Sequence, residues 1–185
     1  MKKKLIIAVV AMLCTLTVGI GTTLAYLLAV SGPVVNTFTV GDVMIHIKET
    51  TGNIYRLIPG TTVEKDPVVT VEKGSEECYL YVKLERTGEL DTYVTYELAD
   101  GWEILGGIDG VYYRKVEAAA VNMKYHVFAN DQLTISSDLT KDKMATIGIG
   151  EYRLIVTAYA IQTSGIESPS DGWYNLLTAL EEVAS

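Results

Sequence analysis

Short stretches in which apolar side chains alternate with other side chains recur along most of this sequence. The clearest lies between residues 78 and 85, where Cys78, Leu80, Val82 and Leu84 occupy every second position. A period of two places these four side chains on one face of a β-strand and the intervening Tyr, Lys and Glu side chains on the other. We expect the first face in the core and the second on a sheet surface that is only partly exposed to water.

Turn dipeptides separate these stretches, among them Pro59-Gly60, Asp100-Gly101 and Asp109-Gly110. Further strands are expected over residues 38–47, with a bend or bulge at Gly41-Asp42, and over residues 67–71, 102–105, 111–116, 133–136 and 152–161. Residues 102–105 and 111–116 are expected to pair as a hairpin, and 152–161 to form a central strand. Twelve Tyr residues and a hydrophobic content of 49% favour strands around a substantial core. The pattern predicts an all-β protein, an antiparallel jelly-roll-like β-sandwich.

Near the C-terminus the spacing of apolar residues changes from that of a strand to that of a helix. Ser168 at an N-cap, Pro169 at the first helical position and Asp171 two residues later are typical of a helix start. Apolar residues then recur at helical spacing, at Trp173, Leu176, Leu177 and Leu180. One short terminal helix is therefore expected over residues 169–183.

The N-terminus is typical of a secretion signal. Lys2, Lys3 and Lys4 precede an apolar stretch over residues 5–19, and Thr23 and Ala25 place small residues at the −3 and −1 positions of a cleavage site. This pattern predicts a signal peptide over residues 1–25, cleavage before Tyr26, and a single β-sandwich domain over residues 26–185. A signal peptidase would be a partner during export, and the mature chain would be secreted or held at the cell surface.

The N-terminal sequence has two other interpretations. Apolar residues continue to Val30, and the run from Leu5 to Val30 is long enough to span a bilayer as an uncleaved anchor. In that case the membrane would be contacted only through this segment. A lipoprotein is disfavoured, because Leu13 precedes Cys14 where a lipobox requires a small residue.

The charge and the cysteine content of the chain limit its possible partners and disulfide links. Residues 1–25 hold three of the 15 basic residues and no acidic one, so the remainder has 12 basic against 23 acidic residues, a net charge of −11. A chain this acidic repels phosphate backbones, so no nucleic-acid partner is expected. Removal of Cys14 leaves Cys78 alone, either as a buried strand residue or as a thiol that links two subunits.

No catalytic constellation is apparent. The chain has two histidines, His46 and His126, and no His-Glu-x-x-His motif. Cys78 has no neighbouring histidine, and no serine lies in a Gly-x-Ser-x-Gly context. Loop carboxylates at Asp100, Asp109, Asp131 and Asp138 lack the spacing of a calcium loop and are expected to form turns. We therefore predict no catalytic residue, metal ligand or cofactor. The alternative is a site built from His46, His126 and a distant carboxylate.

The leader and the first strand resemble a known group. The stretch from Gly19 to Tyr26, followed by Asn36-Thr37-Phe38-Thr39-Val40-Gly41, is similar to the start of TasA/camelysin proteins of Gram-positive bacteria. Later stretches also resemble this family, at Pro59-Gly60, residues 65–67 and 79–83, Trp102 with residues 109–113, and residues 157–162 with Trp173. One departure is Leu27-Leu28-Ala29-Val30 after Tyr26, where the family often has an acidic or polar residue.

The resemblance implies a jelly-roll subunit of an extracellular, biofilm-type matrix or of the cell surface, with itself or related matrix subunits as partners. Some family members assemble by strand exchange, in which the freed N-terminus of one subunit completes the sheet of the next. Here residues 26–39 would be the donor strand, with Leu28, Val30, Val34, Val35 and Phe38 filling a groove and Pro33 interrupting the ladder once. Alternatively, this segment is simply the first strand of its own domain.

Two rival functions stay open from the sequence. One is a secreted metallopeptidase that uses His46 or His126, because the name camelysin denotes a peptidase. The other is a monomeric surface adhesin or ligand-binding module.

Overall fold

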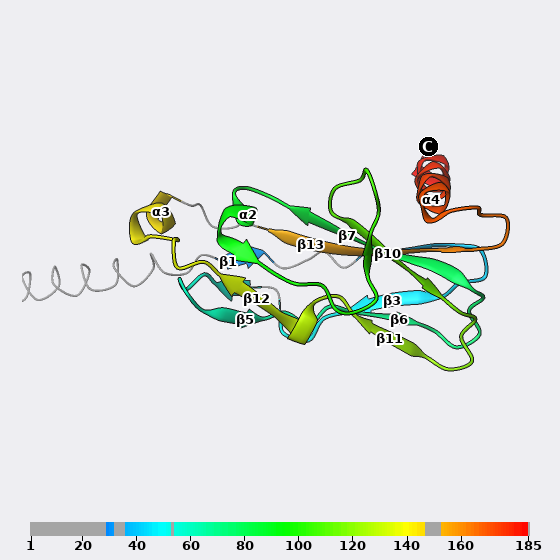
Figure 1. Cartoon of the computed structure of the whole chain (residues 1–185), viewed down its shortest axis with the longest axis horizontal. Helices are drawn as coiled ribbons and strands as arrows, with labels where there is room; N and C mark the ends of the chain where they lie inside the picture. The colour runs from blue at the N-terminus through cyan, green and yellow to red at the C-terminus, as the bar shows by residue number, and fades with distance from the viewer. Residues whose placement is uncertain (1–28, 32–35, 53, 147–152, 185) are drawn as a thin grey trace, which may run out of the picture.

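The computed structural model describes residues 29–31, 36–52, 54–146 and 153–184 (Figure 1). Most of these residues lie in short β-strands or in the loops that join them, so the predicted all-β class is confirmed. The strands are β1 (Ala29–Ser31), β2 (Asn36–Val40), β3 (Ile45–Lys48), β4 (Ile54–Arg56), β5 (Thr62–Glu64), β6 (Val68–Val71), β7 (Cys78–Arg86), β8 (Val94–Thr95), β9 (Glu103–Ile104), β10 (Val111–Val116), β11 (Met123–His126), β12 (Gln132–Ile135) and β13 (Leu154–Gln162).

One layer is a five-stranded sheet in the order β2-β13-β7-β10-β9. The nine-residue strands β7 and β13 pair antiparallel along their whole length, and β13 lies inside the sheet as expected. Strands β9 and β10 form the predicted hairpin. At the β2 edge the expectation of an antiparallel sandwich is wrong, because β2 runs parallel to β13. A parallel pair cannot be closed by a hairpin, and here most of the chain lies between the two strands.

The opposite layer consists of two three-stranded sheets, β11-β6-β3 and β5-β12-β8. They lie end to end, because β5 continues into β6 and β11 continues towards β12. The Lys65 N–H donates to the Asp131 carbonyl at 2.7 Å, and the Val127 N–H to the Pro67 carbonyl at 3.0 Å. These backbone hydrogen bonds connect the two sheets where one ends and the other begins. The two sheets thus form one long layer below the five-stranded sheet in Figure 1.

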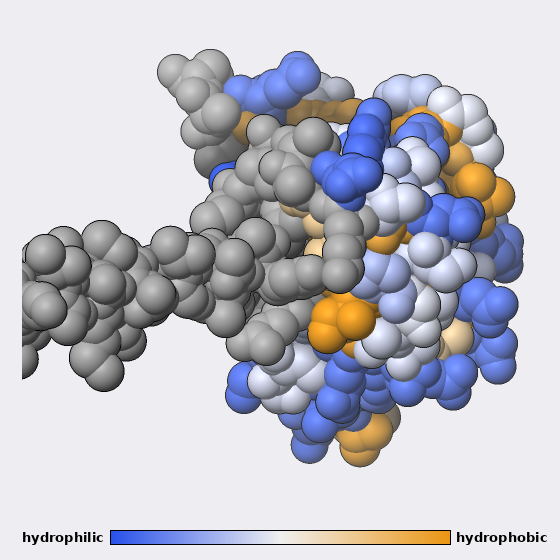
Figure 2. Space-filling model, turned by 90° about the vertical axis from the view of Figure 1, so that its left-hand side faces the viewer, coloured by the Kyte–Doolittle hydropathy of each residue, from blue (hydrophilic) through white to orange (hydrophobic). Residues whose placement is uncertain are grey.

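The main core fills the space between the layers. Cys78, Leu80, Val82 and Leu84 all point into it, as their alternation predicted, and each is at most 3% exposed. They meet side chains of β6, such as Val69 and Val71. At roughly 1.5–3 kcal/mol for each large aliphatic side chain buried, this face of β7 is a major source of stability. In the end-on view of Figure 2, hydrophobic residues appear only as separate areas among hydrophilic ones.

The helix α4 (Pro169–Ala184) covers the other face of the five-stranded sheet. Ser168 caps it as predicted: its Oγ accepts a hydrogen bond from the Asp171 N–H at 3.2 Å and donates to the Asp171 carboxylate at 2.6 Å. Trp173 and Leu176 form a second core with Tyr81 and Tyr159, whereas Leu177 is 37% exposed. The face of β7 that carries Tyr81 is thus covered by the helix.

Close contact between α4 and β7 depends on Gly172. The Tyr81 hydroxyl donates to the Pro169 carbonyl at 2.7 Å, across the first turn of the helix. A Cβ atom at Gly172 would lie 2.4 Å from that hydroxyl oxygen, closer than non-bonded atoms approach. A glycine at this position therefore lets the helix lie against the sheet.

Some local elements were not expected from the sequence. They are the short helices α2 (Leu90–Tyr93) and α3 (Lys141–Thr146) and the 3-10 turn η2 (Ala129–Asp131). The expected bend at Gly41-Asp42 is a larger change, because it takes the chain from β2 in one layer to β3 in the other, with Gly41 at φ +89°. Among the helices of the described residues, none is long and apolar enough to cross a membrane.

Candidate strand-addition site

The residues predicted for signal cleavage and strand donation are only partly covered by the structure. Thr23, Ala25 and Tyr26 lie outside the described residues, and so do Leu28, Val34 and Val35. Val30 lies in β1 and Phe38 in β2, on either side of Pro33. The backbone pairing of these two strands therefore locates the N-terminal segment on the fold.

Both N-terminal strands pair with their own domain, each at the end of a sheet. Strand β1 is antiparallel to β4, with Val30 opposite Tyr55. Strand β2 is parallel to β13, with Phe38 opposite Tyr159. The segment thus covers two backbone edges, one on β4 and one on β13, and these are the acceptor edges of the candidate site.

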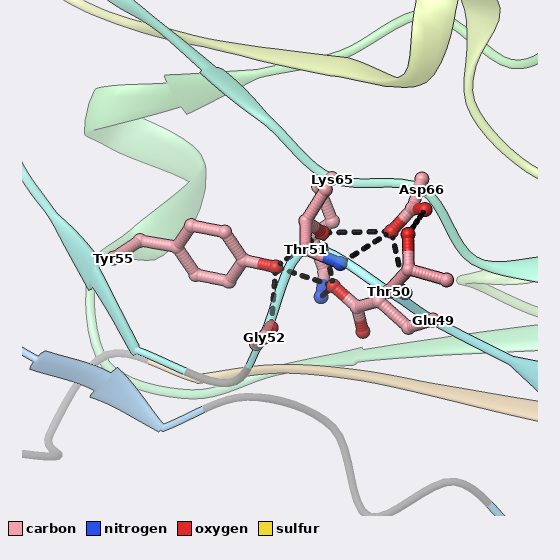
Figure 3. A network of polar contacts seen from close by, with 7 residues as sticks. All are labelled: Glu49, Thr50, Thr51, Gly52, Tyr55, Lys65 and Asp66. Atoms are coloured by element: carbon pink, nitrogen blue, oxygen red, sulfur yellow. Dashed lines mark hydrogen bonds and ion pairs between the residues drawn. The ribbon is translucent and has the colours of Figure 1, made fainter.

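A buried polar network holds β4 in place (Figure 3). The Lys65 ammonium lies 2.8 Å from Oε1 of Glu49, and the two side chains are 2% and 3% exposed. The Tyr55 hydroxyl contacts the same Glu49 oxygen and lies 2.6 Å from the carbonyl oxygen of Gly52. Lys65 also lies over the Tyr55 ring, 5.1 Å from its centre. Tyr55, the central residue of β4, is therefore fixed to the end of β3 and to the link between β5 and β6.

Burial sets the protonation of this network. It lowers the pKa of Lys65, against the opposing attraction of the Glu49 carboxylate. Burial, followed by the hydrogen bond to Glu49, raises the pKa of Tyr55 above its ordinary value, so the hydroxyl keeps its proton. The second oxygen of Glu49, Oε2, is buried and has no hydrogen-bond partner among the described residues. Because this oxygen is unsatisfied, the stability of the buried Glu49 carboxylate depends strongly on the positive charge of Lys65.

The loop after β3 is fixed by a second carboxylate. Asp66 accepts hydrogen bonds from the backbone N–H groups of Thr50 and Thr51, both at 2.9 Å, and from both threonine hydroxyls. Burial alone would raise the pKa of Asp66, but these four bonds outweigh it and hold the pKa well below its usual range. The loop that leads into β4 is thereby tied to the start of β6.

A small cavity of about 20 Å³ lies behind Tyr55 and Lys65. Its other lining residues are apolar side chains, among them Leu57, Leu133 and Leu154. This volume matches one water molecule rather than a substrate. The network positions a strand edge, and sequence reasoning did not identify it. In the sequence, the Lys65-Asp66-Pro67 stretch carries only a resemblance to a family, with no local signal of burial.

The histidines lie together on another surface. His46 of β3 and His126 of β11 line one open groove on the outer face of the β11-β6-β3 sheet. His46 Nδ1 lies 3.1 Å from Glu72, and His126 Nδ1 lies 2.8 Å from Asp131. Within the described residues, no group of three or more His, Cys, Asp or Glu side chains is arranged to hold a metal ion.

The structure also shows the surroundings of Cys78 and of two of the loop carboxylates. Cys78 is fully buried, and burial raises the pKa of its thiol to about 12. The idea that it links two subunits is therefore wrong for the folded chain, and the buried strand residue is the correct alternative. Among the loop carboxylates, Asp109 forms an ion pair with Arg86 at 3.1 Å. Asp131 pairs with His126 and has a positive φ of 53°.

Comparison with known proteins gives no relative. No family model matches the chain, and neither a curated protein nor a solved structure matches it.

Proposed function

We propose that this chain is an exported structural protein of the cell surface or extracellular matrix that assembles by β-strand addition, on a jelly-roll-like sandwich. The observation that carries the proposal is the placement of β1 and β2. Each pairs along a single edge, with β4 or with β13, and each lies at the end of its sheet. An identical segment from a second copy can make the same backbone hydrogen bonds at both edges.

Exchange of an identical segment costs little, because the bonds lost within one chain are regained between two chains. The segment's own chain holds it at an effective concentration of about a millimolar, which favours the closed monomer. Cleavage before Tyr26 would free the segment's end from the bilayer and allow it to reach a neighbour. Dense secretion at the cell surface would supply the high local concentration that exchange requires.

An acceptor edge must keep its shape while its own strand is absent. The network of Glu49, Tyr55 and Lys65 supports this requirement at β4, because it fixes the strand through side chains rather than through β1. At the other edge, β13 is held by its antiparallel pairing with β7 over nine residues. Both edges therefore have support that does not depend on the N-terminal segment.

The test is N-terminal sequencing and size analysis of the protein recovered from culture medium. We expect a chain that begins at or near Tyr26 and forms large assemblies, and we expect deletion of residues 26–39 to abolish them. A synthetic peptide of residues 26–40 should block assembly of the intact protein by occupying the acceptor edges, and a scrambled peptide should not.

Other outcomes would favour other functions. A chain that stays monomeric at every concentration would overturn strand addition and favour an adhesin or ligand-binding module. An intact N-terminus found only in membranes would indicate an anchored surface protein. Peptidase activity that chelators remove, and that requires His46 or His126, would indicate a metallopeptidase.

A further inference from the structure

The outer face of the β11-β6-β3 sheet holds every histidine of the chain. Register places His46 of β3 opposite Thr70 of β6, and Thr70 opposite Lys124 of β11. The next row is Lys48, Val68 and His126. The two histidines and two lysines therefore form the walls of an open groove of about 320 Å³ along β6, and the smaller Val68 and Thr70 side chains lie between them.

Charges around the groove nearly cancel while the histidines are neutral. Lys48 and Lys124 make no ion pair within the described residues, and they face three carboxylates: Asp66 in the groove, Glu72 beside His46 and Asp131 beside His126. The net charge of this face is then −1. It becomes +1 when both histidines carry a proton.

Histidine is the side chain that ordinarily gains its proton between about pH 8 and pH 5. His46 is 48% exposed and His126 is 53% exposed, so both rings are accessible to solvent and to a partner. The chain has no other histidine, so this side-chain type is confined to this face. Among the described residues only three carboxylates border the groove, so most of the acidic residues of the chain lie elsewhere.

We propose that this face, defined by His46, Lys48, Lys124 and His126, docks the acidic surface of a second copy of the chain when the pH falls. Charge complementarity identifies the occupant: a chain of net charge −8 repels its copies at neutral pH, and protonation gives it one positive face. The contact is distinct from strand addition, because it uses side chains on a sheet face rather than backbone edges.

The symmetry of the contact follows from its charge. A two-fold contact would place this face against itself, so two positive surfaces would meet. The contact is therefore heterologous, with the groove of one copy on a different, acidic surface of the next. Heterologous contacts repeat along an open chain unless the rotation closes into a ring. Acidification is thus expected to give larger species rather than a simple dimer.

Sedimentation velocity at pH 7.5 and pH 5.5, in low salt, tests the proposal. We expect association to tighten by about tenfold on acidification, as two or three exposed charge pairs would supply. The H46Q/H126Q variant should lose this gain while associating normally at pH 7.5. The K48Q/K124Q variant should associate more weakly at pH 5.5. Added salt should reduce the gain, because the pairs are exposed to solvent.

A matched control separates the groove from net charge. The K83Q/K115Q variant removes two positive charges from β7 and β10 of the other sheet, and at pH 5.5 it should associate as strongly as the parent chain. Association governed by net charge alone would instead weaken K83Q/K115Q and K48Q/K124Q equally, because each variant loses two positive charges. An equal gain in H46Q/H126Q, or no gain in the parent chain, would overturn the proposal. Strand addition is tested separately, by measuring the assembly of the variant that lacks residues 26–39 at pH 7.5.

Discussion

The Nζ atom of Lys65 lies 2.8 Å from Oε1 of Glu49, with both side chains almost completely buried. Attraction across this distance compensates for removing the two charges from water only while both partners are present. Among the described residues Glu49 Oε2 has no partner, so the carboxylate depends on the Lys65 ammonium and on the Tyr55 and Thr51 hydroxyls, which all contact Oε1. The pair is therefore a point at which the fold is sensitive to single substitutions.

Removal of one partner should cost far more than removal of both. We expect K65M to lower the free energy of unfolding by about 3–5 kcal/mol, because it leaves the Glu49 charge buried and uncompensated. The double variant E49L/K65M, with apolar side chains at both positions, should be clearly more stable than K65M alone. Urea unfolding of both variants checks this expectation, and a K65M protein within about 0.5 kcal/mol of the parent would contradict it.

Acid should weaken the fold through Asp66. Its folded-state pKa is depressed by the Thr50 and Thr51 hydrogen bonds, against the effect of burial, whereas a free aspartate titrates near pH 4. The stabilisation is therefore fully present above about pH 4 and is lost as the pH falls towards the folded-state value. Unfolding by urea between pH 6 and pH 3 should give a flatter stability profile for D66N than for the parent chain. Parallel profiles would show that other carboxylates dominate.

Gly172 provides a test in which two effects have opposite signs. Helix propensity alone predicts that G172A stabilises α4 by about 1 kcal/mol. The contact of 2.4 Å between a Cβ atom and the Tyr81 hydroxyl oxygen predicts destabilisation instead, and we expect this effect to be the larger. In G172A/Y81F the next contacts are with Ile161 and Ile166 at 3.2 and 3.3 Å, so much of the loss should be recovered. A double-mutant cycle by thermal unfolding measures the coupling, and additive effects would contradict the packing described here.

The Cys78 thiol should be unreactive in the folded chain. It is fully buried, and burial raises its pKa to about 12, so the thiolate is both scarce and inaccessible at pH 8. We expect iodoacetamide to modify Cys78 only as fast as the protein unfolds, and rapidly in guanidinium chloride. Mass spectrometry of the peptide that contains Cys78 distinguishes it from Cys14 in any uncleaved chain. Rapid modification under native conditions would contradict its burial.

Sequence reasoning predicted the features that depend on local patterns. Alternation identified the core face of β7, and the Ser168-Pro169-Ser170-Asp171 stretch located the start of α4 to within a residue. The hairpin of β9 and β10 followed from the Asp109-Gly110 turn between two apolar stretches. Each of these features is decided by residues that lie close together in the chain.

Features decided by distant residues were not predicted. Parallel pairing of β2 with β13 has no local signal, because a strand's own pattern does not state the direction of its partner. The polar network is similar in this respect: Glu49 and Lys65 read separately as ordinary surface residues, and only the fold buries them together. The same holds for His46 and His126, which strand register brings to one groove.

The parallel pairing of β2 with β13 has a consequence for the order of folding. Asn36 lies opposite Thr157 and Val40 lies opposite Ile161, so the two strands come from distant parts of the chain. Pairing over such a large sequence separation is slow, because a long loop must close before any hydrogen bond is gained. The five-stranded sheet therefore cannot be completed at this edge until β13 has formed. Although β2 comes early in the chain, it takes its place in this sheet late in folding.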